Sequence, residues 1–216
     1  MKIGTCVNFS EIDGMEKKFA QLREHNFDSC QLVSWNPAAW TDENANTLKT
    51  LLEQYQITVS AFWCGWSGPA AWNFYDGPLT LGLVPVEYRQ MRIENLCDGA
   101  DFAHKLGITD VVTHMGFIPE NPYDPNFSSF CIAVRTVAEH LKKNGQCLLF
   151  ETGQETPVTM LRCFEAVGTD NLYVNLDTAN LILYGKANPA DALDVFGKYV
   201  RNLHAKDGCY PTNGHE

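Results

Sequence analysis

The chain has 216 residues, 45% of them hydrophobic, and a formal net charge of -10 that arises from 16 Lys and Arg against 26 Asp and Glu. This length and apolar content are enough to bury a substantial core, and we expect residues 1–216 to form a single domain. An acidic chain without a basic stripe repels a phosphate backbone, which excludes nucleic acid as the expected partner.

Seven short apolar runs bounded by polar residues predict seven β-strands. In chain order they cover residues 2–7, 29–33, 58–63, 110–113, 147–150, 172–176 and 201–203. The segments between them repeat apolar residues at a period of about 3.6, which predicts amphipathic helices. A longer insertion separates the third strand from the helix that follows it.

Helix boundaries are signalled by residues of their own. Thr156 and Asn188 each stand before a proline, as a capping residue does at a helix start, and Gly107 and Gly145 stand where helices are expected to end. Strands and helices therefore alternate, with a spacing of roughly 25 to 35 residues, which is the pattern of parallel βα units.

Polar residues at the strand ends favour a closed barrel over an open sheet. His114, Glu151, Asp177 and His204 follow four successive apolar runs on their carboxyl sides, where a (β/α)₈ barrel gathers its functional residues. An open sheet is expected to have a Gly-rich first turn, and "FSEIDG" is not one. We predict an α/β fold, a parallel (β/α)₈ TIM-type barrel. Such barrels need about 250 residues, so we expect this sequence to be truncated after the seventh strand, with the C-terminal strand and helices missing.

Two carboxylates and an imidazole are predicted to converge on the inner face of the barrel. Side chains alternate across a strand and neighbouring strands lie about 4.8 Å apart, which brings Glu151, Asp177 and His204 together beside Leu149 and Asn175. Each alone fits an isolated polar residue at the barrel rim, but two facing carboxylates repel each other unless a cation lies between them. This oxygen and nitrogen set suits one divalent ion, Mn²⁺, Zn²⁺, Co²⁺ or Mg²⁺.

Four further polar residues are candidates for a role around this centre. His114 either binds a substrate hydroxyl or caps the fourth strand, and Asn180 either contacts substrate or stabilises its local turn. Glu155 and Asp207 are expected in the second shell, where they cap the following segment or orient a ligand.

The tryptophans fall in the first third of the chain, at the ends of the second and third strands and in the loops beyond. They are Trp35, Trp40, Trp63, Trp66 and Trp72. Aromatic faces pack against the C–H faces of sugars, so we predict Trp35 and Trp63 as substrate contacts. The alternative is a loop that covers its own small hydrophobic cluster.

The sequence also predicts a cellular setting. Its N-terminus lacks the features of a signal peptide, and no segment reaches about 18 uninterrupted apolar residues, so we expect a cytoplasmic protein that does not enter membranes. The eight cysteines are scattered without a CxxC pair. We therefore expect reduced thiols in the core rather than disulfides.

Three segments resemble the metal-binding strand ends of the xylose-isomerase-like TIM barrel superfamily, in its sugar phosphate isomerase/epimerase branch. They are "FETGQE" at 150–155, "NLDTAN" at 175–180 and "NLHAKD" at 202–207. The resemblance implies that Glu151, Asp177 and His204 hold the metal, and the family's fourth ligand, a Glu on the eighth strand, has no counterpart in this sequence. The apurinic endonuclease branch needs extra histidines for three zinc ions, and "AFWCGW" and Asn180 stand where two of them are expected.

The resemblance implies a metal-dependent isomerase or epimerase that acts on a small sugar, sugar phosphate or polyol ketone by proton transfer through an enediolate. Glu151 is then both ligand and catalytic base. The alternatives are an inosose-type dehydratase, which is a lyase, and a barrel that binds a sugar or metal without turnover. The identity of the sugar and of the metal stays open at this point, and so does the oligomeric state.

Overall fold

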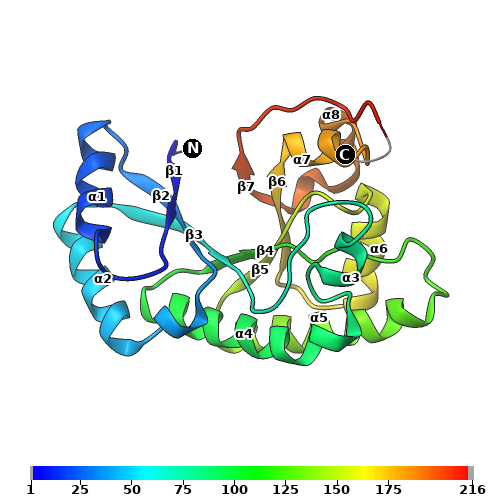
Figure 1. Ribbon diagram of the computed structural model, residues 1–216, viewed down its shortest axis with the longest axis horizontal. Helices are drawn as coiled ribbons and strands as arrows, with labels where there is room; N and C mark the ends of the chain where they lie inside the picture. The colour runs from blue at the N-terminus through cyan, green and yellow to red at the C-terminus, as the bar shows by residue number, and fades with distance from the viewer. Residues whose placement is uncertain (1, 214–216) are drawn as a thin grey trace.

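One curled sheet of parallel strands forms the centre of the molecule. In the computed structural model, which describes residues 2–213, seven parallel strands pair in chain order. They are β1 Thr5–Asn8, β2 Ser29–Ser34, β3 Thr58–Cys64, β4 Asp110–Thr113, β5 Cys147–Glu151, β6 Leu172–Asp177 and β7 Val200–His204. The helices are α1 Met15–Glu24, α2 Asp42–Gln54, α3 Gly77–Thr80, α4 Val86–Lys105, α5 Pro125–Lys143, α6 Pro157–Val167, α7 Thr178–Leu183 and α8 Pro189–Phe196, with 3₁₀ turns at Pro37–Ala39 and Gly197–Tyr199. The sheet curls into a half-barrel of the α/β TIM type, with α4 and α5 along its outer side (Figure 1).

The predicted alternation of strands and helices is confirmed, with small shifts at the ends. The first strand runs from Thr5 to Asn8 rather than over residues 2–7, because its pairing with β2 begins at Thr5 opposite Cys30. Two short helices, α3 and α7, were not predicted; they have four and six residues. Helices this short do not repeat an apolar face often enough to be recognised by period.

The predicted helix boundaries are also confirmed. The hydroxyl of Thr156 accepts a hydrogen bond from the backbone N–H of Thr159 at 3.2 Å, and the side chain of Asn188 accepts one from Ala190 at 2.8 Å. Gly107 follows α4 with a φ of 74° and Gly145 follows α5 with a φ of 70°. Glycine adopts this left-handed backbone without strain, so both helices turn sharply back toward the next strand.

Side chains alternate between an outer and an inner layer. On β5, Leu148 and Phe150 pack outward in the main core beneath the helices, whereas Leu149 belongs to a smaller inner cluster with Trp63 and Val112. This alternation continues to the strand end, so Glu151 lies on the inner face. None of the helices within residues 2–213 is both long and apolar enough to cross a membrane.

The insertion between β3 and α4, residues 65–85, is held against the barrel by a buried arginine. Arg92 on α4 is fully buried and donates to the carbonyl oxygens of Gly82 at 2.7 Å and Pro69 at 2.8 Å. Its guanidinium also lies 5.2 Å from the ring centroid of Trp66. The guanidinium of Arg92 therefore contacts the insertion at Gly82, Pro69 and Trp66 and stabilises its position against α4.

Candidate functional site

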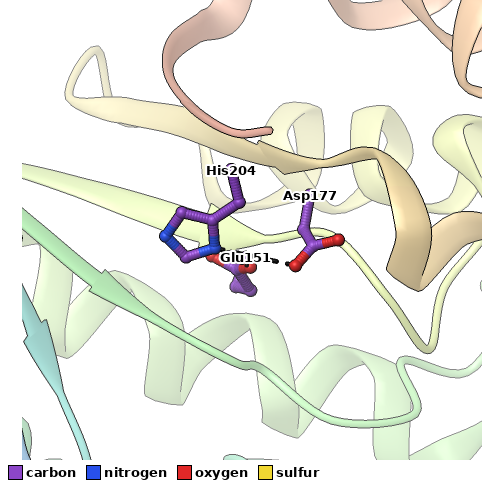
Figure 2. A group of neighbouring side chains, drawn as sticks. All are labelled: Glu151, Asp177 and His204. Atoms are coloured by element: carbon purple, nitrogen blue, oxygen red, sulfur yellow. Dashed lines mark hydrogen bonds and ion pairs between the residues drawn. The ribbon is translucent and has the colours of Figure 1, made fainter. Parts of the chain in front are cut away.

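The carboxyl ends of three neighbouring strands bring together the predicted metal ligands. Glu151 ends β5, Asp177 ends β6 and His204 ends β7, and the last two are opposite each other in the sheet. Nδ1 of His204 lies 2.9 Å from Oε1 of Glu151 and 3.6 Å from Oδ2 of Asp177 (Figure 2). Possible ligand atoms of all three residues lie within 4.8 Å of one another, which is a possible site for one metal ion.

The charges of the three side chains depend on one another. Burial raises the pKa of Glu151, although hydrogen bonding to His204 opposes the rise. Burial also opposes ionisation of Asp177, but hydrogen bonds from His204 and from the backbone of Asn180, together with the charge of Lys206, lower its pKa overall. For His204, burial alone would lower the pKa, and its bonds to Asp177, Cys6 and Glu151 instead raise it to about 12. A protonated ring therefore supplies the positive charge that two facing carboxylates require.

The donor atoms of these three side chains would also suit a divalent cation between them. Two carboxylate oxygens and an imidazole nitrogen are a donor set that Mg²⁺, Mn²⁺, Co²⁺ or Zn²⁺ accepts, and positions remain for water or substrate. To bind, the ion would displace the proton on Nδ1 of His204, since that nitrogen faces both carboxylates.

Amide and ammonium groups surround the three residues; of these, Gln31 and Lys206 were not predicted as part of the site. Asn175 Nδ2 donates to Oε2 of Glu151, and Gln31 Oε1 lies 2.7 Å from Nε2 of His204. Lys206 Nζ donates to Oδ2 of Asp177 at 3.3 Å. The sequence does mark Gln31, because it is an amide between the apolar residues Cys30 and Leu32 of β2.

A cavity of about 840 Å³ opens beside these groups. Glu151, Asp177 and His204 line it, and much of the remaining wall consists of rings. The ring side chains are Trp35, Trp63, Trp72, His114, Tyr184 and Tyr210. The site is therefore a charged centre with aromatic surroundings, a combination suited to a small polar molecule with apolar C–H faces.

Trp35 packs against two other tryptophans of the wall, whereas Trp40 lies elsewhere. The ring centroid of Trp35 lies 5.0 Å from that of Trp63 and 6.0 Å from that of Trp72. Trp35 and Trp72 remain 39% and 45% exposed, so part of each ring is open to a ligand. Trp40, in contrast, is buried on the outer side of the sheet against Phe62, and it belongs to the main core.

His114 and Asn180 both line the cavity, as expected of residues near a substrate. Burial lowers the pKa of His114 to about 3, so its imidazole is neutral and can donate one hydrogen bond and accept another. The amide of Asn180 donates to the carbonyl oxygen of Thr152 at 3.1 Å and accepts from Lys206 at 2.7 Å. Their contacts with a substrate stay predictions.

Glu155 and Asp207, the two carboxylates predicted to cap the following segment or orient a ligand, lie in different surroundings. Glu155 is 2% exposed, and burial raises its pKa to about 8. Asp207 is exposed, and its Oδ1 accepts from the backbone N–H of Gly208 at 2.8 Å. Within residues 2–213 neither carboxylate hydrogen-bonds to Glu151, Asp177 or His204, and their roles at the centre stay predictions.

All eight cysteines are free, as expected, but only four are buried in the core; Cys97 and Cys147 are partly buried, and two are exposed. Cys6 and Cys209 are exposed and line the cavity. Cys6 differs from the expectation because it lies on β1, an edge strand of the sheet, which no strand within residues 2–213 covers on that side.

Comparisons with known proteins agree with this geometry. The family model described as "Xylose isomerase-like TIM barrel" matches residues 19–216. A xylose isomerase domain protein from Planctomyces limnophilus has 29% identity and a TM-score of 0.87, over 95% of this chain and 74% of that one. An L-ribulose 3-epimerase has 20% identity and a TM-score of 0.73, over 94% of this chain and 69% of that one. A xylose isomerase-like TIM barrel protein from Mycobacterium smegmatis, in complex with magnesium, has 20% identity and a TM-score of 0.71, over 95% of this chain and 74% of that one. At these identities the last two show the fold alone.

Proposed function

Since this chain belongs to the xylose isomerase-like TIM barrel family, we propose that it is a divalent-metal-dependent isomerase or epimerase of a small sugar, sugar phosphate or polyol ketone. The observation that carries the proposal is the group formed by Glu151, Asp177 and His204, whose ligand atoms lie within 4.8 Å of one another at an aromatic cavity. Sugar epimerases among the fold neighbours, and one neighbour in complex with magnesium, support it.

In this proposal Glu151, Asp177 and His204 hold one ion, Mn²⁺, Zn²⁺, Co²⁺ or Mg²⁺. When bound, the ion supplies Lewis-acid polarisation of the substrate carbonyl and stabilises the negative charge that develops on its oxygen. Asp177 is held for this task by two hydrogen bonds to its carboxylate, from the backbone N–H of Asn180 at 2.9 Å and from Lys206 Nζ at 3.3 Å.

Glu151 is the proposed catalytic base. It removes a proton from the carbon next to the carbonyl. In an isomerase the proton returns to the neighbouring carbon, whereas in an epimerase a second acid, which the eighth-strand Glu of the family would supply, protonates the same carbon from its other face. Its place supports this role, because Glu151 lines the cavity and belongs to the group that would hold the ion beside the substrate carbonyl. Asn175 donates to Oε2 and so orients the carboxylate.

The cavity wall is the proposed sugar site. Trp35 and Trp63 would pack against the C–H faces of the substrate, while the neutral ring of His114 and the amide of Asn180 would bond its hydroxyls. Because these side chains exclude water from one side of the cavity, they would also protect an enediolate from unwanted protonation.

Hydrogen exchange at carbon tests the proposal directly. We expect the Mn²⁺-loaded protein to incorporate solvent deuterium next to the carbonyl of a ketose or inosose, as followed by NMR and mass spectrometry. Glu151→Gln should reduce the exchange by at least about 10²-fold, and excess metal should not restore it. His204→Ala should lose metal affinity and recover part of its activity in excess metal.

The other outcomes identify the alternatives. Release of water from the substrate would replace the isomerase by a dehydratase. Binding of sugar without any exchange would indicate a non-catalytic barrel. Three zinc ions per chain by elemental analysis, instead of about one, would revive the endonuclease interpretation.

A further inference from the structure

A glutamine on β2 reaches across the inside of the half-barrel to the proposed metal ligands. Gln31 is 7% exposed, and its Oε1 lies 2.7 Å from Nε2 of His204, although β2 and β7 are not neighbours in the sheet. Its Nε2 donates to Oδ1 of Asn175 at 2.9 Å. Asn175 in turn donates to Oε2 of Glu151. Four side chains from four strands thus form one continuous chain of hydrogen bonds.

The direction of every bond in this chain follows from its end at Glu151. An ionised carboxylate only accepts, so Asn175 must turn its NH₂ group toward Glu151 and its oxygen toward Gln31. Gln31 must then turn its own NH₂ group toward Asn175. Its carbonyl oxygen is left facing His204, and it can only accept the proton on Nε2.

That acceptor decides which nitrogen of His204 is free for a metal. With the proton held on Nε2, the neutral ring has its lone pair on Nδ1, which faces Glu151 at 2.9 Å and Asp177 at 3.6 Å. The other polar neighbour of Nε2, Sγ of Cys6, is farther away at 3.9 Å and is a weak acceptor.

We propose that Gln31 is a positioning residue, which acts together with Asn175 to hold His204 in the tautomer that presents Nδ1 to a divalent cation. The inference rests on the metal site of the proposed function. A bond of this kind to the second nitrogen of a ligand histidine raises metal affinity by about 10- to 100-fold. Gln31 does this from the opposite side of the half-barrel, through an amide whose orientation Glu151 itself sets.

A purely structural role for Gln31 makes a different prediction, and a matched control separates the two. Gln146 is also a buried glutamine, 2% exposed, and it donates to the carbonyl oxygens of Ala100 and Ile108 away from the cavity. Gln31→Leu and Gln146→Leu make the same chemical change and both remove buried hydrogen bonds. Only the first removes a partner of His204.

The experiment measures Zn²⁺ affinity by calorimetry and the state of His204 by ¹⁵N NMR of the Zn²⁺-loaded protein, with His204→Ala to assign the signal. We expect a proton on Nε2 and zinc on Nδ1 in the wild type, an affinity about 10- to 100-fold lower in Gln31→Leu, and an unchanged affinity in Gln146→Leu. Equal affinity in Gln31→Leu and the wild type would overturn the inference, as would zinc on Nε2. If Gln31→Leu does not fold, zinc on Nε2 in the wild-type spectrum would still overturn the inference. Failure of the wild type to bind any divalent ion would instead overturn the proposed function.

Discussion

Glu155 offers a quantitative test of how burial acts on charge next to the site. The residue lies between β5 and α6, is 2% exposed, and has its pKa raised from 4.5 to about 8 by burial. One pKa unit corresponds to about 1.4 kcal/mol, so ionising Glu155 inside the folded protein costs up to about 5 kcal/mol. The substitution Glu155→Gln removes this titration and nearly preserves the shape of the side chain.

The sign of the pH dependence follows from proton binding. Between pH 4.5 and about 8 the folded protein keeps the proton of Glu155, whereas the unfolded chain has lost it. The contribution of Glu155 to stability is therefore fully present below pH 4.5 and is lost as the pH rises through about 8. Glu155→Gln stays neutral throughout, so its free energy of unfolding should fall less over this range than that of the wild type, by several kcal/mol.

Urea unfolding of the metal-free protein at about pH 5 and about pH 9 measures this difference. Other groups titrate as well, but they are shared by wild type and variant and cancel in the comparison. Glu165→Gln is the matched control, since Glu165 lies on α6 with its side chain exposed; we expect it to follow the wild type. The reasoning is refuted if Glu155→Gln and the wild type lose the same free energy between the two pH values.

Two further predictions concern the insertion between β3 and α4. Gly82 has a φ of 63°, and a Cβ there would lie 2.0 Å from the carbonyl of Met115, so Gly82→Ala should lower the free energy of unfolding by more than about 3 kcal/mol. Gly107 has a φ of 74° but open space around it, so Gly107→Ala should lower the free energy of unfolding by only about 1–2 kcal/mol in the same urea titration. Equal losses of stability in the two variants would contradict the close approach of Gly82 to Met115. Trp72→Ala should weaken sugar binding by about 0.5–1.5 kcal/mol, measured as a higher KM, and leave Zn²⁺ affinity unchanged. A sugar affinity equal to that of the wild type would remove Trp72 from the sugar site.

The sequence by itself determined the order of strands and helices and the residues at the strand ends. The spacing of apolar residues is a local property of the chain, and so is the position of capping residues and glycines. These properties suffice to predict β5, β6 and β7 and the helix starts at Thr156 and Asn188. Once the strands are parallel, Glu151, Asp177 and His204 must leave the same edge of the sheet, so their proximity was also predictable. Helices as short as α7 contain too few residues to show a period.

Only the tertiary structure decided which side chains meet across the interior. Gln31 and His204 are 173 residues apart, on strands that are not paired, and their contact depends on how strongly the sheet curls. In the same way, Trp35 faces the cavity while Trp40, five residues later, is buried in the outer core. A local pattern states which face of an element a residue occupies. The curvature of the sheet and the path of the loops decide what lies opposite that face.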